Sequence, residues 1–509
     1  MKSILRWLSL FAHKRFPLHR CLAVMLPALL ALLLMLGSGA TQQVHAAVAR
    51  PASPFGGTGD AIIPGGSWTD TAGNSLQAHG AGFIQVGRTW YWFGENRTQN
   101  NWLFVAISCY ASNDLVHWQF RGNVLTLQSS GDLGPNRVVE RPKVVYNVRT
   151  RTFVMYLHID NTSYSEAKVG VATSKFVDHG YTYQGSYNPL GNESRDMTVF
   201  QDTDGTAYLI YATKNNYDLN IDRLSSDYLT DTGTVYTFNI RWEAPGMIKL
   251  KGRYYLIDSS PTGWAPNANV YVSATSLSGP WTTPASLAPN SPNTYDSQDA
   301  YILPVNGLFG TTYIYMGDRW DPTALGNSRY IWLPLTFSGT NISISYYDAW
   351  KINTITGQWR AISTTSYEAE SSTNTLAGSA VIMNCSNCSG GKDVGYLGNN
   401  SGTLQFNGVS ARSSVVGTGP TIPGHSGTYL LTIYYANGDS AARTASISIN
   451  GAAASSYSFA SSHGGNLVAT LPIFVQLKQG SSNTITFSNT SSWAPDIDKI
   501  TIADDTAGW

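Results

Sequence analysis

A sequence repeat that occurs five times constrains the fold of this chain more than any other feature. Each copy opens with a polar residue, continues as a short apolar strand, turns and returns as an aromatic strand. The five openers are His79, Glu140, Asp196, Glu243 and Gln298. A repeat of roughly 50 residues built from short strands is typical of propeller blades, which bury their faces by stacking around an axis. Equivalent positions meet at the centre of such a ring, so we predict that the five openers converge on one pocket.

Residues 1–46 have the pattern of a secretory signal peptide. Five basic residues precede an apolar run from Cys21 to Leu36, and Val44-His45-Ala46 offers a small-residue cleavage site. The alternative is an uncleaved membrane anchor, which Pro27 and the modest length of the run disfavour. We therefore predict a secreted, extracellular protein with no membrane association after cleavage.

The charge balance narrows the class of ligand. The chain of 509 residues has a formal net charge of zero, and 13% of its residues are charged, against about 25% in ordinary globular proteins. Nucleic acid or an anionic membrane surface would need a basic patch, so neither is an expected partner. Many Trp and Tyr residues with little charge fit a neutral, hydroxyl-rich ligand such as a sugar, although aromatic residues also fill β cores.

Strand-like alternation dominates after residue 46, with turn signals such as Asp202-Thr203-Asp204-Gly205 between the strands. We predict an all-β protein: a five-bladed β-propeller over residues 60–353, a linker or capping strand over 354–366, and a β-sandwich over 367–503. Gly, Ser, Ala and Asn dominate the last region, and a low-complexity stalk is the poorer interpretation because strands still recur there. We expect a monomer.

Three cysteines remain after removal of the signal peptide. In an oxidising compartment, Cys385 and Cys388 are most simply a local disulfide; a redox or zinc role is less favoured because no second ligand pair is visible. Cys109 lies in a strand-like segment and is predicted to be a buried, inert thiol.

Two of the openers suit acid–base chemistry. Glycoside hydrolysis generally needs one protonated carboxylic acid for the leaving oxygen and an opposite group that activates water or attacks the anomeric carbon. A second carboxylate nearby raises the pKa of the acid. We predict Glu243 as the general acid and Asp196 as the group that raises its pKa. The alternative, carboxylates paired with neighbouring Arg141 and Arg195, is weaker for five polar openers in register, because burying them without function is costly.

Six segments carry a family resemblance: Leu76-Gln77-Ala78-His79-Gly80-Ala81-Gly82, Ser112-Asn113-Asp114-Leu115-Val116-His117-Trp118, Glu140-Arg141-Pro142-Lys143-Val144, Ser194-Arg195-Asp196-Met197, Trp242-Glu243-Ala244-Pro245 and Ser297-Gln298-Asp299. They resemble the blade motifs of glycoside hydrolase family 43, and most closely those of its exo-β-1,3-galactanase branch. The resemblance covers roughly residues 60 to 360. It implies a five-bladed propeller that inverts anomeric configuration and needs no cofactor for catalysis.

One departure from the family pattern concerns the catalytic base. Most members carry an Asp near the start of the first blade, where this chain has Ala78-His79-Gly80. The resemblance implies that Gln298 faces the reaction centre instead, and we predict that it positions the water; the base stays unassigned. Asp299, one residue on, is expected to face away by strand alternation.

The resemblance also implies substrate contacts by Glu95, Glu140 and Tyr164. For Glu95 the alternative is a surface carboxylate beside Arg97. Three tryptophans are candidates either for sugar stacking or for core packing: Trp102, Trp264 and Trp320.

The C-terminal region has a resemblance of its own, carried by Tyr367-Glu368-Ala369-Glu370, residues 390–398, Ile449-Asn450-Gly451 and residues 496–500. These segments look like carbohydrate-binding module family 35, which implies a β-sandwich with a structural calcium. The predicted calcium ligands are Glu368, Glu370 and Asp498; for Glu368 or Glu370 singly, a solvated surface acid is the alternative. The predicted sugar-binding residues of this module are Tyr396, Asn437, Asp439 and Trp493.

The expected function is exo-acting hydrolysis of β-1,3-galactan of the arabinogalactan type, with inversion. Two alternatives stay open at this point. One is an arabinofuranosidase or β-xylosidase of the same family, and the other is a propeller that binds galactan without cleaving it.

Overall fold

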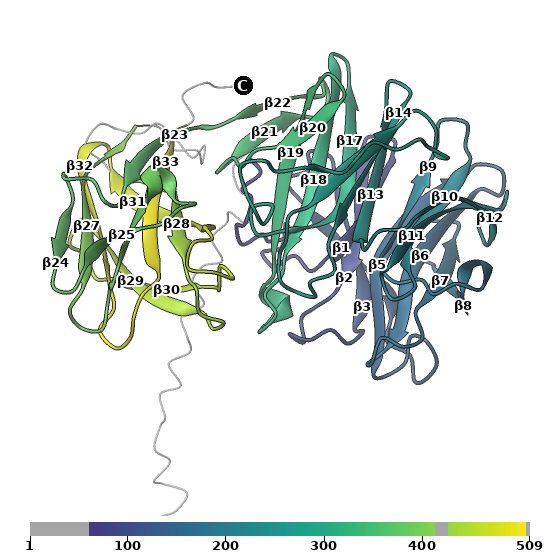
Figure 1. The fold of residues 1–509 in the computed structure, drawn as a ribbon, viewed down its shortest axis with the longest axis horizontal. Helices are drawn as coiled ribbons and strands as arrows, with labels where there is room; N and C mark the ends of the chain where they lie inside the picture. The colour runs from purple at the N-terminus through teal and green to yellow at the C-terminus, as the bar shows by residue number, and fades with distance from the viewer. Residues whose placement is uncertain (1–60, 413–425, 505–509) are drawn as a thin grey trace, which may run out of the picture. The chain divides into compact units, whose positions relative to one another are not determined.

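The computed structural model describes residues 61–412 and 426–504, and the predicted signal peptide lies outside them (Figure 1). The described residues form antiparallel strands with short 3-10 turns at η1 (Pro189–Gly191), η2 (Leu325–Asn327) and η3 (Ser389–Gly391). The all-β prediction is confirmed. Across these two ranges, no helix has the length and apolar character needed to cross a membrane.

Five four-stranded antiparallel sheets follow one another between residues 79 and 344 of the described chain. The first sheet contains β1 (His79–Val86), β2 (Thr89–Glu95), β3 (Ala106–Ser112) and β4 (Gln119–Thr126). The second sheet contains β5 (Arg137–Asn147), β6 (Thr152–Asn161), β7 (Lys168–Ser174) and β8 (Thr182–Tyr187). The third sheet contains β9 (Met197–Gln201), β10 (Ala207–Thr213), β11 (Asp218–Leu224) and β12 (Asp231–Phe238). The fourth sheet contains β13 (Glu243–Leu250), β14 (Arg253–Ser259), β15 (Val270–Ala274) and β16 (Ala285–Ser286). The fifth contains β17 (Gln298–Gly307), β18 (Gly310–Arg319), β19 (Arg329–Ser338) and β20 (Asn341–Ile344).

The first strands of these sheets neighbour one another in a cycle. β1 lies against β5, β5 against β9, β9 against β13, β13 against β17, and β17 against β1. Each pair of adjacent sheets also encloses its own apolar core, such as the Trp92, Trp118 and Trp332 cluster between the first and fifth sheets. The sheets are therefore held together face to face, and their first strands share the centre.

A β-bulge follows the opener in the first, second and fourth sheets. The residue after the opener has a positive φ in each case: 59° at Gly80, 53° at Arg141 and 55° at Ala244. An extra residue at this point turns the strand end and re-aims the side chains beside it. A positive φ in Arg141 and Ala244 is strained for a residue with a Cβ, a cost typical of functional sites.

The C-terminal region contains two packed sheets. One has the order β25 (Val381–Asn384), β26 (Lys392–Gly395), β33 (Asp496–Asp504), β28 (Ser426–Ala436), β31 (Ala469–Lys478), with β23 (Ser363–Glu368) paired to β33. The other has the order β24 (Thr375–Ala377), β27 (Thr403–Ala411), β32 (Gly480–Ser488), β29 (Arg443–Ile449), β30 (Ser455–Phe459). Their inner faces share one apolar core that includes Phe406, Leu431 and Phe487. Residues 354–366 are not a bare linker, because they include β22 (Gln358–Ala361), which pairs with β21 (Trp350–Asn353), and the start of β23.

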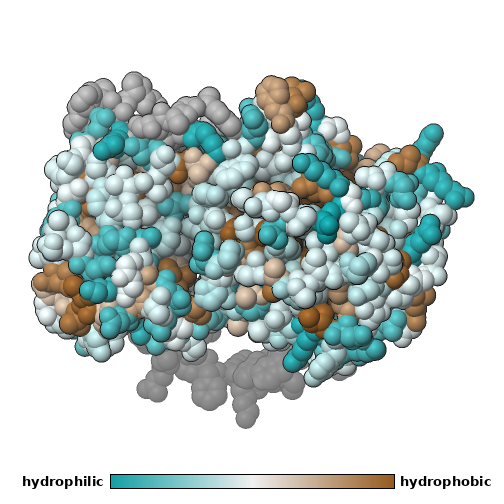
Figure 2. All heavy atoms as spheres, turned by 45° about the horizontal axis from the view of Figure 1, so that its top comes forward, coloured by the Kyte–Doolittle hydropathy of each residue, from teal (hydrophilic) through white to brown (hydrophobic). Residues whose placement is uncertain are grey.

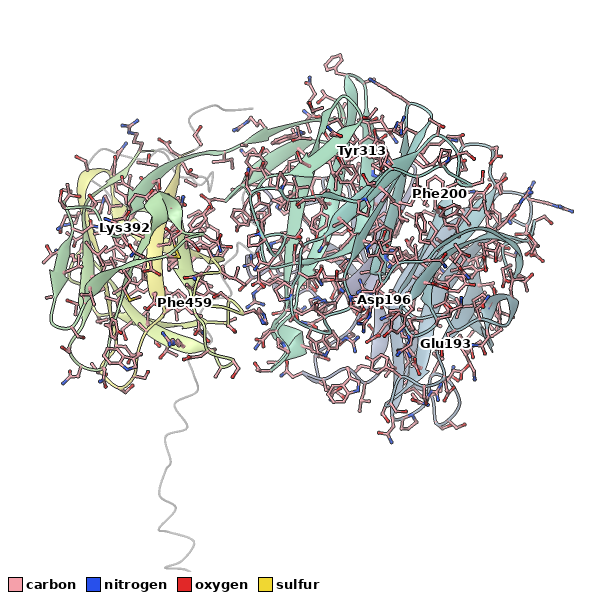
Figure 3. The ribbon with its side chains drawn as sticks, in the orientation of Figure 1. Glu193, Asp196, Phe200, Tyr313, Lys392 and Phe459 are labelled. Atoms are coloured by element: carbon pink, nitrogen blue, oxygen red, sulfur yellow. A yellow bond between two sulfur atoms is a disulfide. The ribbon has the colours of Figure 1, made fainter. Side chains whose placement is uncertain are left out.

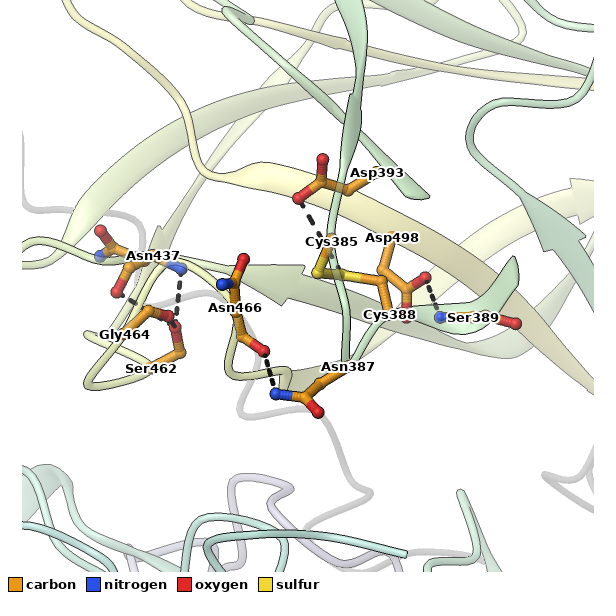
Figure 4. Close-up of a disulfide and its surroundings, with 10 residues drawn as sticks. All are labelled: Cys385, Asn387, Cys388, Ser389, Asp393, Asn437, Ser462, Gly464, Asn466 and Asp498. Carbon is orange, nitrogen blue, oxygen red and sulfur yellow. Dashed lines mark hydrogen bonds between the residues drawn. A yellow bond between two sulfur atoms is a disulfide. The ribbon is translucent and has the colours of Figure 1, made fainter. Parts of the chain in front are cut away.

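The predicted disulfide and the predicted burial of Cys109 are confirmed. Cys385 and Cys388 form a disulfide, and Cys109 is a buried free thiol. Figure 4 shows the disulfide beside Asp393 and Asp498. On the face seen in Figure 2, hydrophobic residues lie in small separate patches among hydrophilic ones.

Candidate active site

A cavity of about 200 Å³ lies where the first strands begin. Four of the five openers line it: Glu140, Asp196, Glu243 and Gln298. Its other lining residues are Glu95, Arg141, Tyr164, Gly263, Trp264 and Trp320. Figure 3 labels Asp196, which precedes β9. The predicted convergence is therefore confirmed for these four residues.

His79 is the exception, and the prediction that it joins the pocket is wrong. Its ring is fully buried and stacks on Tyr330 with centroids 4.8 Å apart. Asp318 holds both the His79 ring, with Nδ1 3.0 Å from Oδ1, and the Gly80 backbone, whose N–H donates to Oδ2 at 2.8 Å. Asp318 therefore holds the imidazole outside the cavity, and no pattern in the sequence predicts this contact.

Glu243 is buried and has the properties of a protonated acid. Burial first, and the negative charge of Asp196 second, raise the pKa of Glu243 to about 8. Its Oε1 accepts a hydrogen bond from Gln298 Nε2 at 2.9 Å, and its Oε2 lies 3.2 Å from Asn216 Nδ2. At neutral pH the carboxyl therefore keeps its proton inside the cavity.

Arg141 is the cation at the centre of the site. Its Nη2 lies 2.7 Å from Asp196 Oδ2 and donates to Gln298 Oε1 at 2.7 Å, and its Nη1 donates to the backbone oxygen of Asp299 at 2.9 Å. The Asp299 side chain is buried outside the cavity lining, as expected. The sequence offers Arg141 as an ion-pair partner for a carboxylate, and in the structure it pairs with Asp196. Its guanidinium connects its own sheet to Asp196 and to Gln298, which belong to two other repeats.

All the hydrogen-bonding groups of Gln298 are engaged. Its Oε1 accepts from Arg141 and from Trp320 Nε1 at 3.0 Å, and its Nε2 donates to Glu243 and to Ser259 Oγ at 3.1 Å. The two donors fix the amide oxygen, so the amide nitrogen must face the acid. A water held by Gln298 in this orientation would accept a hydrogen bond from Nε2.

The three predicted substrate-binding residues form a charged cluster with Arg97. The buried Arg97 Nη2 contacts Glu95 Oε2 and lies 2.9 Å from Glu140 Oε1, and the Tyr164 hydroxyl donates to Glu140 Oε1 at 3.1 Å. Glu95 is 3% exposed, so the surface-carboxylate alternative is wrong. Burial would raise the pKa of Glu140, but hydrogen bonding to His158 and the charge of Arg97 lower it to about 2. Glu140 is an acceptor for hydroxyl groups.

Two of the three tryptophans lie in the cavity. Trp264 meets Trp320 edge to face, with centroids 5.0 Å apart, and both line the site. Trp102 is 43% exposed and does not line it. Arg97, Asn216 and Ser259 were missed as site residues. Of these three, only Arg97 could have been inferred from the sequence, because it lies two positions after Glu95, a predicted substrate-binding residue.

In the C-terminal region, Tyr396 and Trp493 are exposed and meet edge to face, with centroids 5.9 Å apart. Asp439 is exposed and pairs with Arg443 at 2.8 Å. The prediction for Asn437 is wrong, because this residue is fully buried and its Nδ2 donates to the backbone oxygens of residues 441, 459 and 460. Its amide holds a loop and is not available to a sugar.

Comparison with known proteins gives the family. Residues 80–243 match the model described as glycosyl hydrolases family 43. A crystal structure of an exo-β-1,3-galactanase from Phanerochaete chrysosporium with β-1,3-galactotriose is 43% identical with a TM-score of 0.80, and the match covers 87% of this chain and 100% of that one. The chain belongs to glycoside hydrolase family 43. An exo-β-1,3-galactanase of Clostridium thermocellum is 29% identical with a TM-score of 0.58, over 86% of this family 43 chain and 100% of that one.

The C-terminal region is similar to carbohydrate-binding modules. Residues 403–502 match a model described as the CBM13 domain of alpha-galactosidase. A family 35 carbohydrate-binding module from Clostridium thermocellum is 38% identical, with a TM-score of 0.25, over 28% of this chain and 98% of that one. The similarity of this region to a carbohydrate-binding module therefore rests on the family model alone. No curated protein matches the chain.

Proposed function

We propose that this protein is an exo-acting hydrolase of β-1,3-galactan that inverts anomeric configuration. The observation that carries the proposal is the pair of Glu243 and Gln298. Gln298 donates a hydrogen bond to Glu243 in one cavity with three further carboxylates, and burial raises the pKa of Glu243 to about 8. The similarity to an enzyme crystallised with β-1,3-galactotriose supports galactan as the substrate. The cyclic neighbourhood of the five first strands supports a five-bladed propeller.

The size of the cavity supports exo action. Sites for drug-sized ligands have volumes of about 300–1,000 Å³, and this one has about 200 Å³. It therefore suits one terminal sugar residue. Glu95, Glu140 and Tyr164 would bind the hydroxyl groups of that residue, and the indoles of Trp264 and Trp320 would pack on its C–H faces.

Glu243 would protonate the glycosidic oxygen as the bond to the anomeric carbon breaks. Its raised pKa supplies the proton at neutral pH, and Asp196 keeps that pKa high while Arg141 holds Asp196 in place. The hydrogen bond from Asn216 would stabilise the carboxylate left behind.

Gln298 would orient the attacking water from its amide nitrogen. Inverting glycosidases keep their two catalytic groups about 6.5–9.5 Å apart to leave room for the water, whereas Gln298 Nε2 and Glu243 Oε1 are 2.9 Å apart in the free site. The sugar must therefore break this contact when it enters. A neutral amide with both lone-pair directions of its oxygen occupied is no proton acceptor, so its role is positional. The proton of the attacking water would pass to solvent after the new C–O bond forms.

The test is product analysis on linear β-1,3-galactan, with NMR following the anomer formed first. We expect α-galactose as the first product of β-linkages, and no release of arabinose or xylose from arabinoxylan. First-formed β-galactose would exclude inversion. Sugar release from arabinoxylan alone would favour the arabinofuranosidase or β-xylosidase alternative, and binding without any release would favour a non-catalytic propeller.

We also propose a structural calcium in the C-terminal module. Oε2 of Glu368 and Oε2 of Glu370 are buried without a hydrogen-bond partner among the described residues. Burial raises the pKa of Asp498 to about 7, with Glu368 and Glu370 adding to the rise. Ser389 N–H donates to Asp498 Oδ1 (Figure 4). Carboxylate oxygens are the hard ligands that a calcium ion prefers, and an ion held by these three residues would tie β23, the η3 turn and β33 together. We propose in addition that the protein is secreted and monomeric.

A further inference from the structure

A second groove lies at the end of the second and third sheets that points away from the active site. It is formed by the turns that join β5 to β6, β9 to β10, and β11 to β12, and its volume is about 630 Å³. Asn147 and Gln201, which end β5 and β9, line it, whereas Glu140 and Asp196 at the other ends of these strands line the catalytic cavity. The groove and the cavity are therefore separate sites.

Two arginines without ion pairs line this groove. Arg149 comes from the β5–β6 turn and Arg223 from β11, and both are exposed. Among the described residues no carboxylate lies within 4.0 Å of either guanidinium, whereas buried Arg141 and half-buried Arg137 are both paired. Arg149 interacts electrostatically with Asp227 in the β11–β12 turn, but no described carboxylate forms a close ion pair with either guanidinium. Two such guanidiniums on one groove are suited to an anion, which they can hold with charge-assisted hydrogen bonds.

The walls of the groove are fixed before any ligand arrives. Asn147 Nδ2 donates to the backbone oxygen of Ser226 at 2.9 Å, which joins the second sheet to the third. Gln201 Nε2 donates to the Tyr228 hydroxyl at 3.0 Å, which joins β9 to the β11–β12 turn. Rigid walls lower the entropic cost of binding.

The remaining lining favours a sugar over a small inorganic anion. Asp204 places a carboxylate on the groove, which can accept hydrogen bonds from hydroxyl groups but repels a bare anion. Val148 is 73% exposed at the same place and offers an apolar surface to a C–H face. A ligand that satisfies both arginines and Asp204 carries one carboxylate and several hydroxyl groups.

We propose that this groove binds a hexuronic acid residue on a side chain of the polysaccharide. The sugar carboxylate lies between Arg149 and Arg223, and its hydroxyl groups face Asp204 and the amides. The choice of a polysaccharide ligand rests on the proposed function, but the groove itself does not involve the catalytic residues. Such a site would hold acidic, branched galactan on the enzyme while the chain end is hydrolysed.

The test is affinity electrophoresis of the full chain in gels that contain a uronic-acid-bearing galactan or the same polysaccharide after reduction of its carboxyl groups. The variants are Arg149→Ala, Arg223→Ala and the double variant, in a Glu243→Gln background that limits digestion. Arg88→Ala is the matched control, because Arg88 is also an exposed arginine in a hairpin turn with no ion pair among the described residues. Hydrolysis of neutral β-1,3-galactan is measured with the same Arg variants in the otherwise wild-type chain.

We expect each single variant to weaken the retardation of the protein by the acidic galactan about tenfold. Arg88→Ala should leave this retardation unchanged. The Arg149 and Arg223 variants should leave unchanged both the retardation by the carboxyl-reduced galactan and the hydrolysis of neutral galactan. Equal retardation of the double variant and its parent would refute the site. So would displacement of the acidic galactan by inorganic phosphate or acetate as effectively as by glucuronate, because the groove would then bind anions in general. Absence of hydrolysis in the otherwise wild-type chain would count against the proposed function and leave this comparison of binding intact.

Discussion

The substitution Glu243→Gln tests the acid most directly, because the amide has nearly the shape of the protonated carboxyl. Gln298 Nε2 donates to one oxygen of Glu243, and Asn216 Nδ2 lies beside the other. The introduced amide has only one acceptor, so its NH₂ group would meet one of these donors. Asn216 Oδ1 is buried without a partner among the described residues, so a flip of the Asn216 amide gives the new donor an acceptor. We expect the fold to tolerate the change.

The expected loss of activity is large. General acid catalysis contributes about 10²–10⁴-fold, which corresponds to about 3–5 kcal/mol of activation free energy. We therefore expect kcat on β-1,3-galactan to fall by this factor with a small change in KM. An aryl β-galactoside, whose phenolate departs without protonation, should lose much less. A kcat on galactan within tenfold of the unmodified enzyme would remove Glu243 from the acid role.

The same substitution has a consequence for stability that does not depend on substrate. The pKa of Glu243 is raised from 4.5 to about 8, so the folded state binds this proton more tightly than the unfolded chain. That stabilisation is complete below about pH 4.5 and is lost as the pH rises through about 8. The full shift corresponds to about 5 kcal/mol as an upper bound, and Glu243→Gln removes this dependence. The free energy of unfolding should be measured for both proteins at pH 5 and at pH 9. Between these two pH values the parent should lose more stability than the variant does. Equal pH dependence in both proteins would mean that Glu243 is charged in the folded state.

Three further predictions concern the same structure. The value of kcat/KM should fall as the pH rises through about 8, because Glu243 then loses its proton; activity that is constant to pH 10 would contradict this. Trp320→Phe removes the indole N–H that donates to Gln298 Oε1, and we expect kcat to fall about tenfold with KM nearly unchanged; a rise in KM alone would mean that Trp320 acts only by sugar stacking. Chelation by EGTA should lower the Tm of the C-terminal module without changing the hydrolysis of galactotriose, and Asp498→Asn should abolish that effect of EGTA; an unchanged Tm after chelation would exclude a structural calcium.

The parts of the site that could be predicted are those that belong to the repeat. Glu140, Asp196, Glu243 and Gln298 occupy equivalent strand ends, and the cyclic packing of the first strands brings equivalent ends together. His79 has the same position in its repeat, but Asp318 from the fifth sheet holds its ring away from the cavity. Such a contact depends on packing between sheets that are distant in sequence, and no local pattern reports it.

Residues in irregular segments were harder to predict for a related reason. Asn216 lies in a turn of three successive residues with positive φ, and its place beside Glu243 follows from that backbone path. Asn437 has the polar character of a surface residue, yet the loop around it has backbone oxygens that need a buried donor. Polarity alone does not distinguish a residue that binds a ligand from one that satisfies the backbone.

The bulge behind the openers has a consequence for how readily this fold can exchange one chemistry for another. Because an extra residue with a positive φ follows His79, Glu140 and Glu243 alike, the backbone sets the exit direction of each strand end, and the identity of the opener is left free. Acidic and imidazole side chains both occupy such bulged strand ends in this one chain. A designer who wants a new reaction in this scaffold could therefore substitute openers one at a time, and would need to preserve the bulges more strictly than any single catalytic group.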